Sequence, residues 1–118
     1  MISIDLKVGE LEIDQNYFSP KIDIDFLSES TFSSMLELWT SIGIWKSYRI
    51  IKDEMILIFM FKDKFLKTIE ICAIEDSKKI TLSSIIKKLG GEHKYEWGEI
   101  EINNDIKAGY QSVLIKYN

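Results

Sequence analysis

Cysteine, histidine and proline are almost absent from this sequence, which has one of each in 118 residues. A single cysteine cannot form a disulfide within the chain and is typical of a reducing compartment, so we expect a cytoplasmic protein. The longest unbroken apolar run, residues 55–61, has seven residues, whereas a membrane helix needs about 20. The N-terminal residues also lack the basic and apolar regions of a secretory signal. We therefore expect no membrane association.

The scarcity of histidine and cysteine also limits catalysis. A thiol–imidazole pair would need Cys72 and His93, but Cys72 lies in an apolar segment, where free cysteine packs as a small hydrophobic residue. A zinc site needs three or four ligands, more than these two residues supply. The motifs of serine hydrolases, dinucleotide-binding proteins and P-loop proteins are missing. We predict no catalytic residue, no cofactor and no metal site, and therefore not an enzyme.

Carboxylates occur in pairs two residues apart at Glu10 and Glu12, Asp23 and Asp25, and Glu99 and Glu101. On a strand this spacing puts both members on one face, as acid–base or divalent-metal chemistry requires. The same spacing is also found on a face that binds a partner and on one that is simply solvated. No third ligand or calcium-loop pattern accompanies the pairs, which counts against metal or acid–base chemistry and favours a partner-binding or a solvated face.

The net charge of −4 is unevenly distributed. Residues 1–30 have seven acidic and two basic side chains, a net charge of −5. Residues 31–91 have seven acidic and ten basic side chains (+3), and residues 92–118 have five acidic and three basic side chains (−2). The three segments together give the net charge of −4. If the two ends of the chain lie side by side, their acidity forms one continuous patch. Such a patch repels nucleic-acid phosphates and attracts basic proteins, so we expect a protein partner and no nucleic acid.

The apolar pattern predicts a single domain over residues 1–118, of α+β class, with one mostly antiparallel sheet of about six or seven strands and two helices packed on one face. Alternation predicts strands at 2–8, 11–13, 22–26, 44–52, 55–62, 65–75, 93–102 and 113–117, with a loop at 14–21. Apolar residues spaced by three and four predict helices at 29–42 and 82–89. Because residues 55–61 are apolar on both faces, we place that strand inside the sheet.

Aromatic residues near the C-terminal acidic side chains have the composition of a protein-binding face, although most such residues fill cores. Trp97 and Tyr110 are the candidate anchors. The complete set of candidate partner-binding residues is Glu10, Glu12, Asp14, Asp23, Asp25, Glu96, Trp97, Glu99, Glu101, Asp105 and Tyr110.

Two segments, LGGEHKYEWGEI at 89–100 and SVLIKY at 112–117, resemble the tail of small bacterial immunity proteins that accompany secreted or contact-delivered toxins. They cover less than a third of the chain. The resemblance implies a protein that neutralises a cognate toxin by tight binding, without catalysis of its own. An acidic inhibitor suits a basic toxin such as a nuclease, because complementary charges speed encounter and select the partner.

Two other hypotheses remain open. One is a ligand-binding or enzymatic domain with a pocket between the first helix and the sheet, near Trp39 and Trp45. The other is a structural module that forms homo-oligomers through residues 55–61. The sequence leaves the choice between monomer and dimer undecided.

Overall fold

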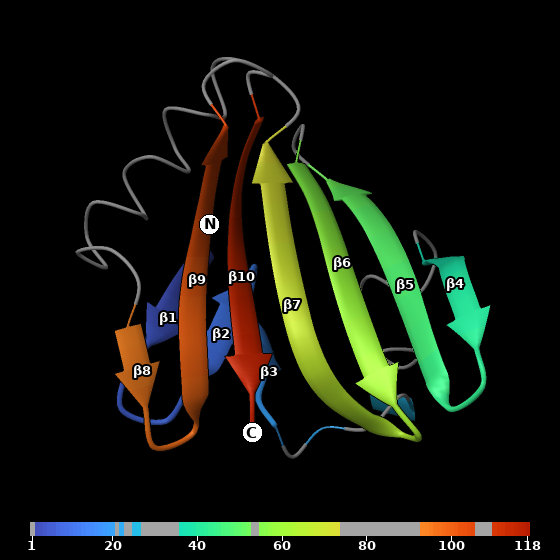
Figure 1. Cartoon of the computed structure of the whole chain (residues 1–118), viewed down its shortest axis with the longest axis horizontal. Coiled ribbons are helices and arrows are strands. Elements are labelled where there is room, and N and C mark those ends of the chain that lie inside the picture. Colours follow the sequence, from blue (N-terminus) through green and yellow to red (C-terminus); the bar gives the residue numbers. More distant parts are fainter. Residues whose placement is uncertain are drawn as a thin grey trace.

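The computed structural model consists almost entirely of β-strands in two antiparallel sheets (Figure 1). It describes residues 2–20, 22, 25–26, 36–52, 55–73, 93–105 and 110–118. The small sheet contains, in spatial order, β1 (Ile2–Asp5), β2 (Glu10–Ile13) and β3 (Asn16–Phe18). The large sheet contains, in spatial order, β4 (Glu37–Ile42), β5 (Trp45–Lys52), β6 (Met55–Lys62), β7 (Phe65–Ala73), β10 (Tyr110–Tyr117), β9 (Gly98–Asp105) and β8 (His93–Tyr95).

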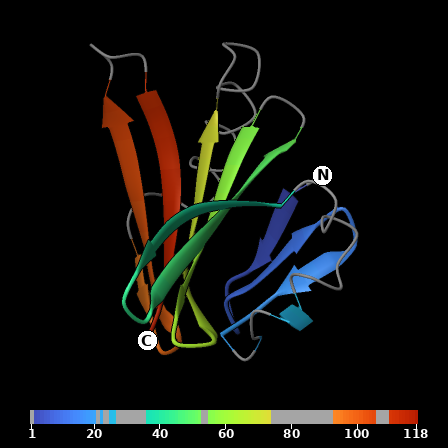
Figure 2. The ribbon, with the colours of Figure 1, turned by 90° about the vertical axis from the view of Figure 1, so that its right-hand side faces the viewer.

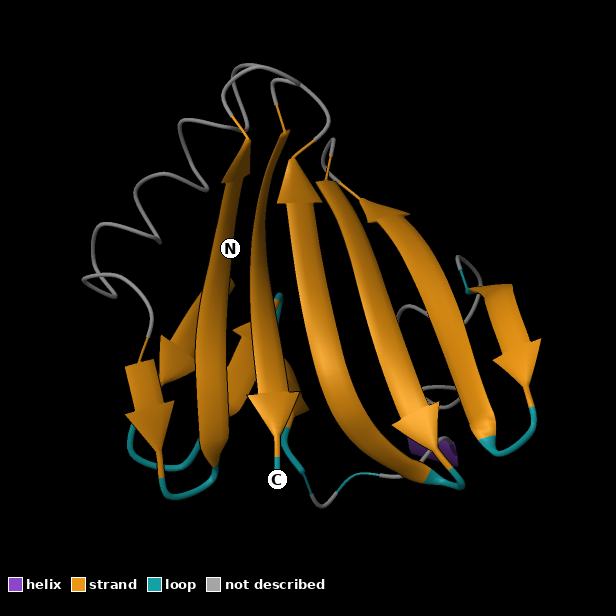
Figure 3. Ribbon diagram, in the orientation of Figure 1, coloured by secondary structure: helices purple, strands orange, loops and turns teal. Residues whose placement is uncertain are grey.

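The predicted α+β class is wrong, although the antiparallel sheet is confirmed. Residues 37–42, predicted as the end of a helix at 29–42, form β4 instead, and the only helical piece among the described residues is a turn at 25–26 (Figure 3). The aromatic and β-branched residues of this segment favour a strand once β5 is available for pairing. Gly43, which follows the predicted helix, has a φ of 60° and lies in the β4–β5 turn. The helix predicted at 82–89 lies outside the described residues.

The small sheet confirms the strand predicted at 11–13, whereas the strand predicted at 2–8 is wrong at residues 6–8, which lie in the turn between β1 and β2. Leu11 and Ile13 are buried, whereas their neighbours on β2 are partly exposed. The predicted loop at 14–21 is wrong at residues 16–18, which form β3 after a tight turn. Asp14 and Gln15 both have positive φ in this turn, as in the two-residue turns that suit a β-hairpin. The strand predicted at 22–26 is absent from the described residues of that segment.

The strands predicted at 44–52, 55–62 and 65–75 correspond to β5, β6 and β7 of the large sheet. β6 lies inside the sheet between β5 and β7, as its two apolar faces indicated. The single strand predicted at 93–102 is wrong, because residues 96–97 form a turn between β8, which ends at Tyr95, and β9, which begins at Gly98. β9 then pairs with β10 over its whole length. β9 and β10 therefore form an antiparallel hairpin at the C-terminal end of the described chain.

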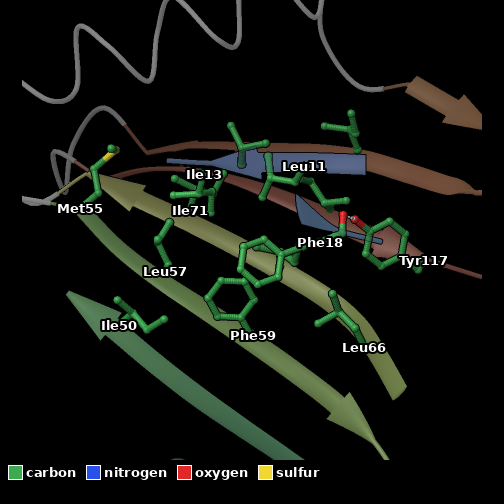
Figure 4. Close-up of a cluster of buried hydrophobic side chains, with 14 of the residues drawn as sticks. Leu11, Ile13, Phe18, Ile50, Met55, Leu57, Phe59, Leu66, Ile71 and Tyr117 are labelled. Carbon is green, nitrogen blue, oxygen red and sulfur yellow. Dashed lines mark hydrogen bonds between the residues drawn. The ribbon is translucent and has the colours of Figure 1, made fainter. Parts of the chain in front are cut away.

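The core lies between the two sheets, which face each other as separate layers (Figure 2). Leu11, Ile13 and Phe18 from the small sheet point toward the large sheet (Figure 4). The rings of Phe18 and Phe59 meet at a centroid distance of 4.8 Å. Each such buried side chain contributes roughly 1.5–3 kcal/mol to folding. Our prediction of one sheet covered by helices is wrong here because the N-terminal strands form a second sheet that covers the first.

Two side chains near the C-terminus also join the sheets through hydrogen bonds. The Tyr117 hydroxyl donates to the carbonyl oxygen of Gly9 at 2.6 Å and lies 3.4 Å from that of Phe18. The Trp97 indole N–H donates to the carbonyl oxygen of Leu6 at 2.8 Å. Burial raises the pKa of the Tyr117 hydroxyl, and the nearby charge of Glu10 raises it further. The neutral hydroxyl is therefore the form that the fold stabilises.

We expect Tyr117→Phe to lower the free energy of unfolding by about 1–3 kcal/mol near neutral pH, because it leaves the Gly9 carbonyl without its buried donor. Unfolded tyrosine ionises near pH 10, so above that pH the unfolded state loses a proton that folded Tyr117 keeps. Wild-type stability should therefore fall with rising pH, by about 1.4 kcal/mol per pH unit from this group. Urea unfolding at several alkaline pH values measures the slope.

Tyr117→Phe should lack this contribution to the slope. The control is Tyr17→Phe, since the side chain of Tyr17 is exposed, and this variant should change the free energy of unfolding near neutral pH by less than about 0.5 kcal/mol. Equal slopes for the wild type and Tyr117→Phe would contradict the assignment.

Candidate functional site

The outer face of the small sheet carries a row of acidic side chains. Asp5 on β1 pairs with Glu10 on β2, and Glu12 on β2 pairs with Tyr17 on β3, so all four lie on the face opposite the buried Leu11. Asp5 is exposed, Glu10 and Glu12 are half-buried, and Tyr17 is 48% exposed. We call Asp5, Glu10, Glu12 and Tyr17 the acidic face.

No cation neutralises the acidic face among the residues that the structure describes. The ion pairs of the described chain lie elsewhere, at Arg49 with Glu37 and at Lys116 with Glu99 and Glu101. Asp5 accepts a hydrogen bond from the backbone N–H of Lys7 at 3.0 Å, which leaves its charge in place. The three carboxylates therefore present their negative charge to solvent, and a cationic partner would have no internal ion pair to break.

Glu99 and Glu101 lie on a different face. They alternate along β9 with Ile100, which is buried against the small sheet, so they point away from that sheet. Lys116 on β10 lies 3.0 Å from Glu101 and 3.7 Å from Glu99. The hydrogen bond to Glu101 and the two negative charges raise the Lys116 pKa. The acidity of this pair is therefore partly neutralised within the sheet.

The continuous acidic patch that we expected from the two ends of the chain does not form across these carboxylates. The small sheet does lie behind β9 and β10 in Figure 1. However, both sheets use their facing sides for the core, so the acidic side chains of each point outward in opposite directions. Glu10 and Glu12 therefore point to the opposite side of the molecule from Glu99 and Glu101, although their strands lie in facing sheets.

The other candidate residues are spread over the molecule. Asp14 is exposed in the β2–β3 turn, next to the acidic face, Asp25 is exposed in the helical turn, and Glu96 is exposed in the β8–β9 turn. Asp105 and Tyr110 form the last pair of the β9–β10 ladder, where the backbone alone is described. Asp23 lies outside the described residues.

The Trp97 side chain packs against other parts of the chain and is not an exposed anchor. Its ring stacks on Tyr95 at a centroid distance of 5.0 Å and an interplanar angle of 5°. A Cβ added to Gly9 would lie 2.6 Å from Trp97 Cε3, so the ring sits directly against that glycine. Together with its hydrogen bond to Leu6, these contacts assign Trp97 to the junction between the sheets.

Tyr17 is the site residue that sequence reasoning missed. It fell in the segment predicted as a loop, because the turn at Asp14 and Gln15 concealed the short strand behind it. The signal was present in the alternation of Asn16, Tyr17 and Phe18, whose first and third side chains are buried.

The structure also separates the residues considered for catalysis. Cys72 on β7 and His93 on β8 have β10 and β9 between their strands, so three strand spacings, about 14 Å, part them. The Cys72 thiol donates instead to Glu70 Oε1 at 3.0 Å. In the described ranges, no three His, Cys, Asp or Glu side chains come together as a metal site. The thiol–imidazole pair is therefore not formed.

The pocket considered between a first helix and the sheet loses one wall, because residues 37–42 are a strand. Trp39 and Trp45 are 50% and 40% exposed on neighbouring strands at the edge of the large sheet. They therefore belong to a surface.

Comparisons with protein-family models, with curated proteins and with solved structures found no match. Among the described residues, no helix has the length and apolar character needed to span a membrane.

Proposed function

We propose that this chain is a cytoplasmic, non-catalytic binding protein that holds a basic protein partner against its acidic face. In line with the resemblance of its C-terminal segments to immunity proteins, the partner would be a cognate toxin domain, for example a nuclease. The observation that carries the proposal is the row of Asp5, Glu10 and Glu12 beside the exposed Tyr17, with no neutralising cation among the described residues.

The chemistry of this face suits a cationic protein surface. Uncompensated carboxylates attract lysine and arginine side chains at a distance and raise the association rate at low salt. Tyr17 supplies a large side chain that loses little conformational entropy on binding, which is a common property of interface anchors. The charges provide steering and selection, and the ring provides contact area.

Co-purification with the product of the adjacent upstream gene, at moderate salt, tests the proposal directly. We expect the two proteins to elute together. If that product is not a toxin, or does not bind this chain, the proposed function is wrong.

The double variant Glu10→Gln/Glu12→Gln should weaken that binding about tenfold, chiefly through slower association with a smaller salt dependence. The matched control is Glu99→Gln/Glu101→Gln, which removes the same charge from a face where Lys116 already neutralises part of it. Surface plasmon resonance at several salt concentrations measures both variants. Equal effects of the two double variants would contradict the choice of the acidic face.

A further inference from the structure

Two neighbouring turns of the large sheet form one end of the molecule, where large apolar side chains are exposed. The β4–β5 turn at residues 43–44 and the β6–β7 turn at residues 63–64 lie at the same end of the sheet (Figure 1). The two turns are joined directly, because the backbone N–H of Asp63 donates a hydrogen bond to the carbonyl oxygen of Ile44 at 2.6 Å. They therefore present a single surface.

The apolar side chains of this surface form a row on one face of the sheet. Ile42 on β4 pairs with Trp45 on β5. Trp45 pairs with Lys62 on β6, which pairs with Phe65 on β7. Residues paired directly across antiparallel strands share a face, and the apolar members of this row are 75%, 40% and 54% exposed. Ile44 in the turn is also 54% exposed. We call Ile42, Ile44, Trp45 and Phe65 the apolar tip.

Unpaired lysines surround the apolar tip. The two hairpin ends, residues 42–46 and 62–65, contain three lysines and one carboxylate, namely Lys46, Lys62, Lys64 and Asp63. All three lysines are exposed, and none of them forms an ion pair within the ranges that the structure describes. The Lys62 ammonium lies 5.5 Å from the centre of the Trp45 ring, a cation–π contact that leaves its charge in place. The tip is therefore both apolar and positively charged.

We propose that the apolar tip binds the surface of a bilayer that contains anionic lipids. The Ile42 and Ile44 side chains enter the boundary between headgroups and acyl chains, as the apolar side of a peripheral protein does. The Trp45 ring suits the same depth, because tryptophan combines a large apolar ring with a polar N–H. The lysines contact the lipid phosphates, which give the cytoplasmic leaflet its negative potential. Our expectation of no membrane association concerned a spanning segment and a secretory signal, and a peripheral contact requires neither.

The acidity of the rest of the chain does not cancel the charge of this tip. Glu99 and Glu101 lie on β9, three strand spacings or about 14 Å from β6. This distance exceeds the Debye length of about 8 Å at physiological salt. The carboxylates of the acidic face lie on the other sheet. An anionic surface that approaches the tip therefore meets its lysines first.

Two other occupants suit the tip less well. Single-stranded nucleic acid stacks its bases on aromatic rings, whereas Lys62 already lies over the Trp45 ring. A second copy placed tip to tip would bring like charges together. Residues 55–61, considered from the sequence as the oligomer contact, have no free strand edge, because β6 is paired on both sides.

Co-sedimentation of the whole chain with lipid vesicles tests the proposal. One set of vesicles contains phosphatidylcholine alone, and the other contains phosphatidylcholine and phosphatidylglycerol in equal parts. We expect the chain to pellet with the anionic vesicles, to a smaller extent at high salt, and to stay in solution with phosphatidylcholine alone.

The double variant Lys62→Gln/Lys64→Gln should lower the partition coefficient onto anionic vesicles at least about tenfold. The matched control is Lys7→Gln/Lys94→Gln, which changes the net charge equally at exposed lysines of the β1–β2 turn and β8. This control should bind like the wild type.

Ile42→Ser should also lower the partition coefficient at least about tenfold, because it removes an apolar side chain from the bilayer boundary. The matched control is Ile51→Ser, since Ile51 is 51% exposed near the other end of β5. Circular dichroism reports whether each variant remains folded. If Ile42→Ser does not fold, Ile44→Ser in the turn replaces it, with the same expected result.

The proposal is overturned if the wild type stays in solution with anionic vesicles, or if the tip variants bind as well as their controls. Sedimentation equilibrium without vesicles adds a further check. A wild type that dimerises and does not bind vesicles would assign the tip to a second copy and would also overturn the proposal. None of these results bears on partner binding by the acidic face, which lies on the other sheet.

Discussion

Replacing Gly98 with alanine is expected to lower the free energy of unfolding by more than about 4 kcal/mol, a large fraction of the roughly 5–15 kcal/mol that stabilises an ordinary domain. Gly98 begins β9, has a φ of 155° and pairs with Tyr117. A Cβ at this position would overlap the backbone carbonyl oxygen of Lys116 and lie 3.0 Å from Tyr117 Cα. Backbone atoms cannot swing aside as a side chain can, so β9 and β10 would have to separate here. Chemical denaturation measures the loss.

Gly43→Ala is the matched control for this change. Gly43 also has a positive φ, of 60°, but no atom lies within 4 Å of a Cβ built there. The variant should therefore lose only the cost of a left-handed backbone, about 1–2 kcal/mol. If both alanine variants lose the same stability, the contact with Lys116 is not what requires glycine at position 98.

The second large effect is expected from Phe18→Ala, which should lower the free energy of unfolding by about 3–5 kcal/mol. Phe18 is fully buried and is the aromatic residue through which the small sheet meets Phe59 of the large sheet. Its removal leaves a cavity between the layers. The loss should be local as well as global, so amides of β1–β3 should exchange hydrogen faster relative to those of β6 and β7.

Phe65→Ala removes the same side chain from an exposed position at the start of β7 and should change stability by less than about 1 kcal/mol. Denaturant unfolding compares the two alanine variants, and hydrogen exchange locates the change. Uniformly faster exchange over both sheets in Phe18→Ala would show that Phe18 acts on the fold as a whole and not on the docking of the small sheet.

The strands could be predicted where the information is local. The alternation in β2 and the doubly apolar run of β6 follow from neighbouring residues, and both were confirmed. The prediction of the first helix was wrong because the spacing of Leu36, Trp39 and Ile42 fits the apolar stripe of a helix as well as it fits a strand. Residues 37–42 form a strand because they pair with β5, which has eight residues. The spacing of neighbouring apolar residues does not reveal this pairing.

The candidate site was predictable to a smaller extent. The shared face of Glu10 and Glu12 follows from their spacing alone. By contrast, the neutralisation of Glu99 and Glu101 depends on the register that brings Lys116 beside them. The partial burial of Trp97 depends on Gly9, which lies in the turn between β1 and β2 of the small sheet. Charge and aromatic content could be read from the sequence, but the side to which each group points required the packing of two sheets.

The hydrogen bond from Tyr117 to Gly9 also bears on the order in which this protein folds, since it joins residues 108 positions apart. During synthesis, β1–β3 leave the ribosome long before β10. Leu11, Ile13 and Phe18 therefore have no completed surface to pack against until the last strand has been made. Contacts between such distant parts of a chain form slowly, because a long loop must close first. The apolar layer of β1–β3 thus stays open until β10 has been made, which is the period when chaperones would protect it.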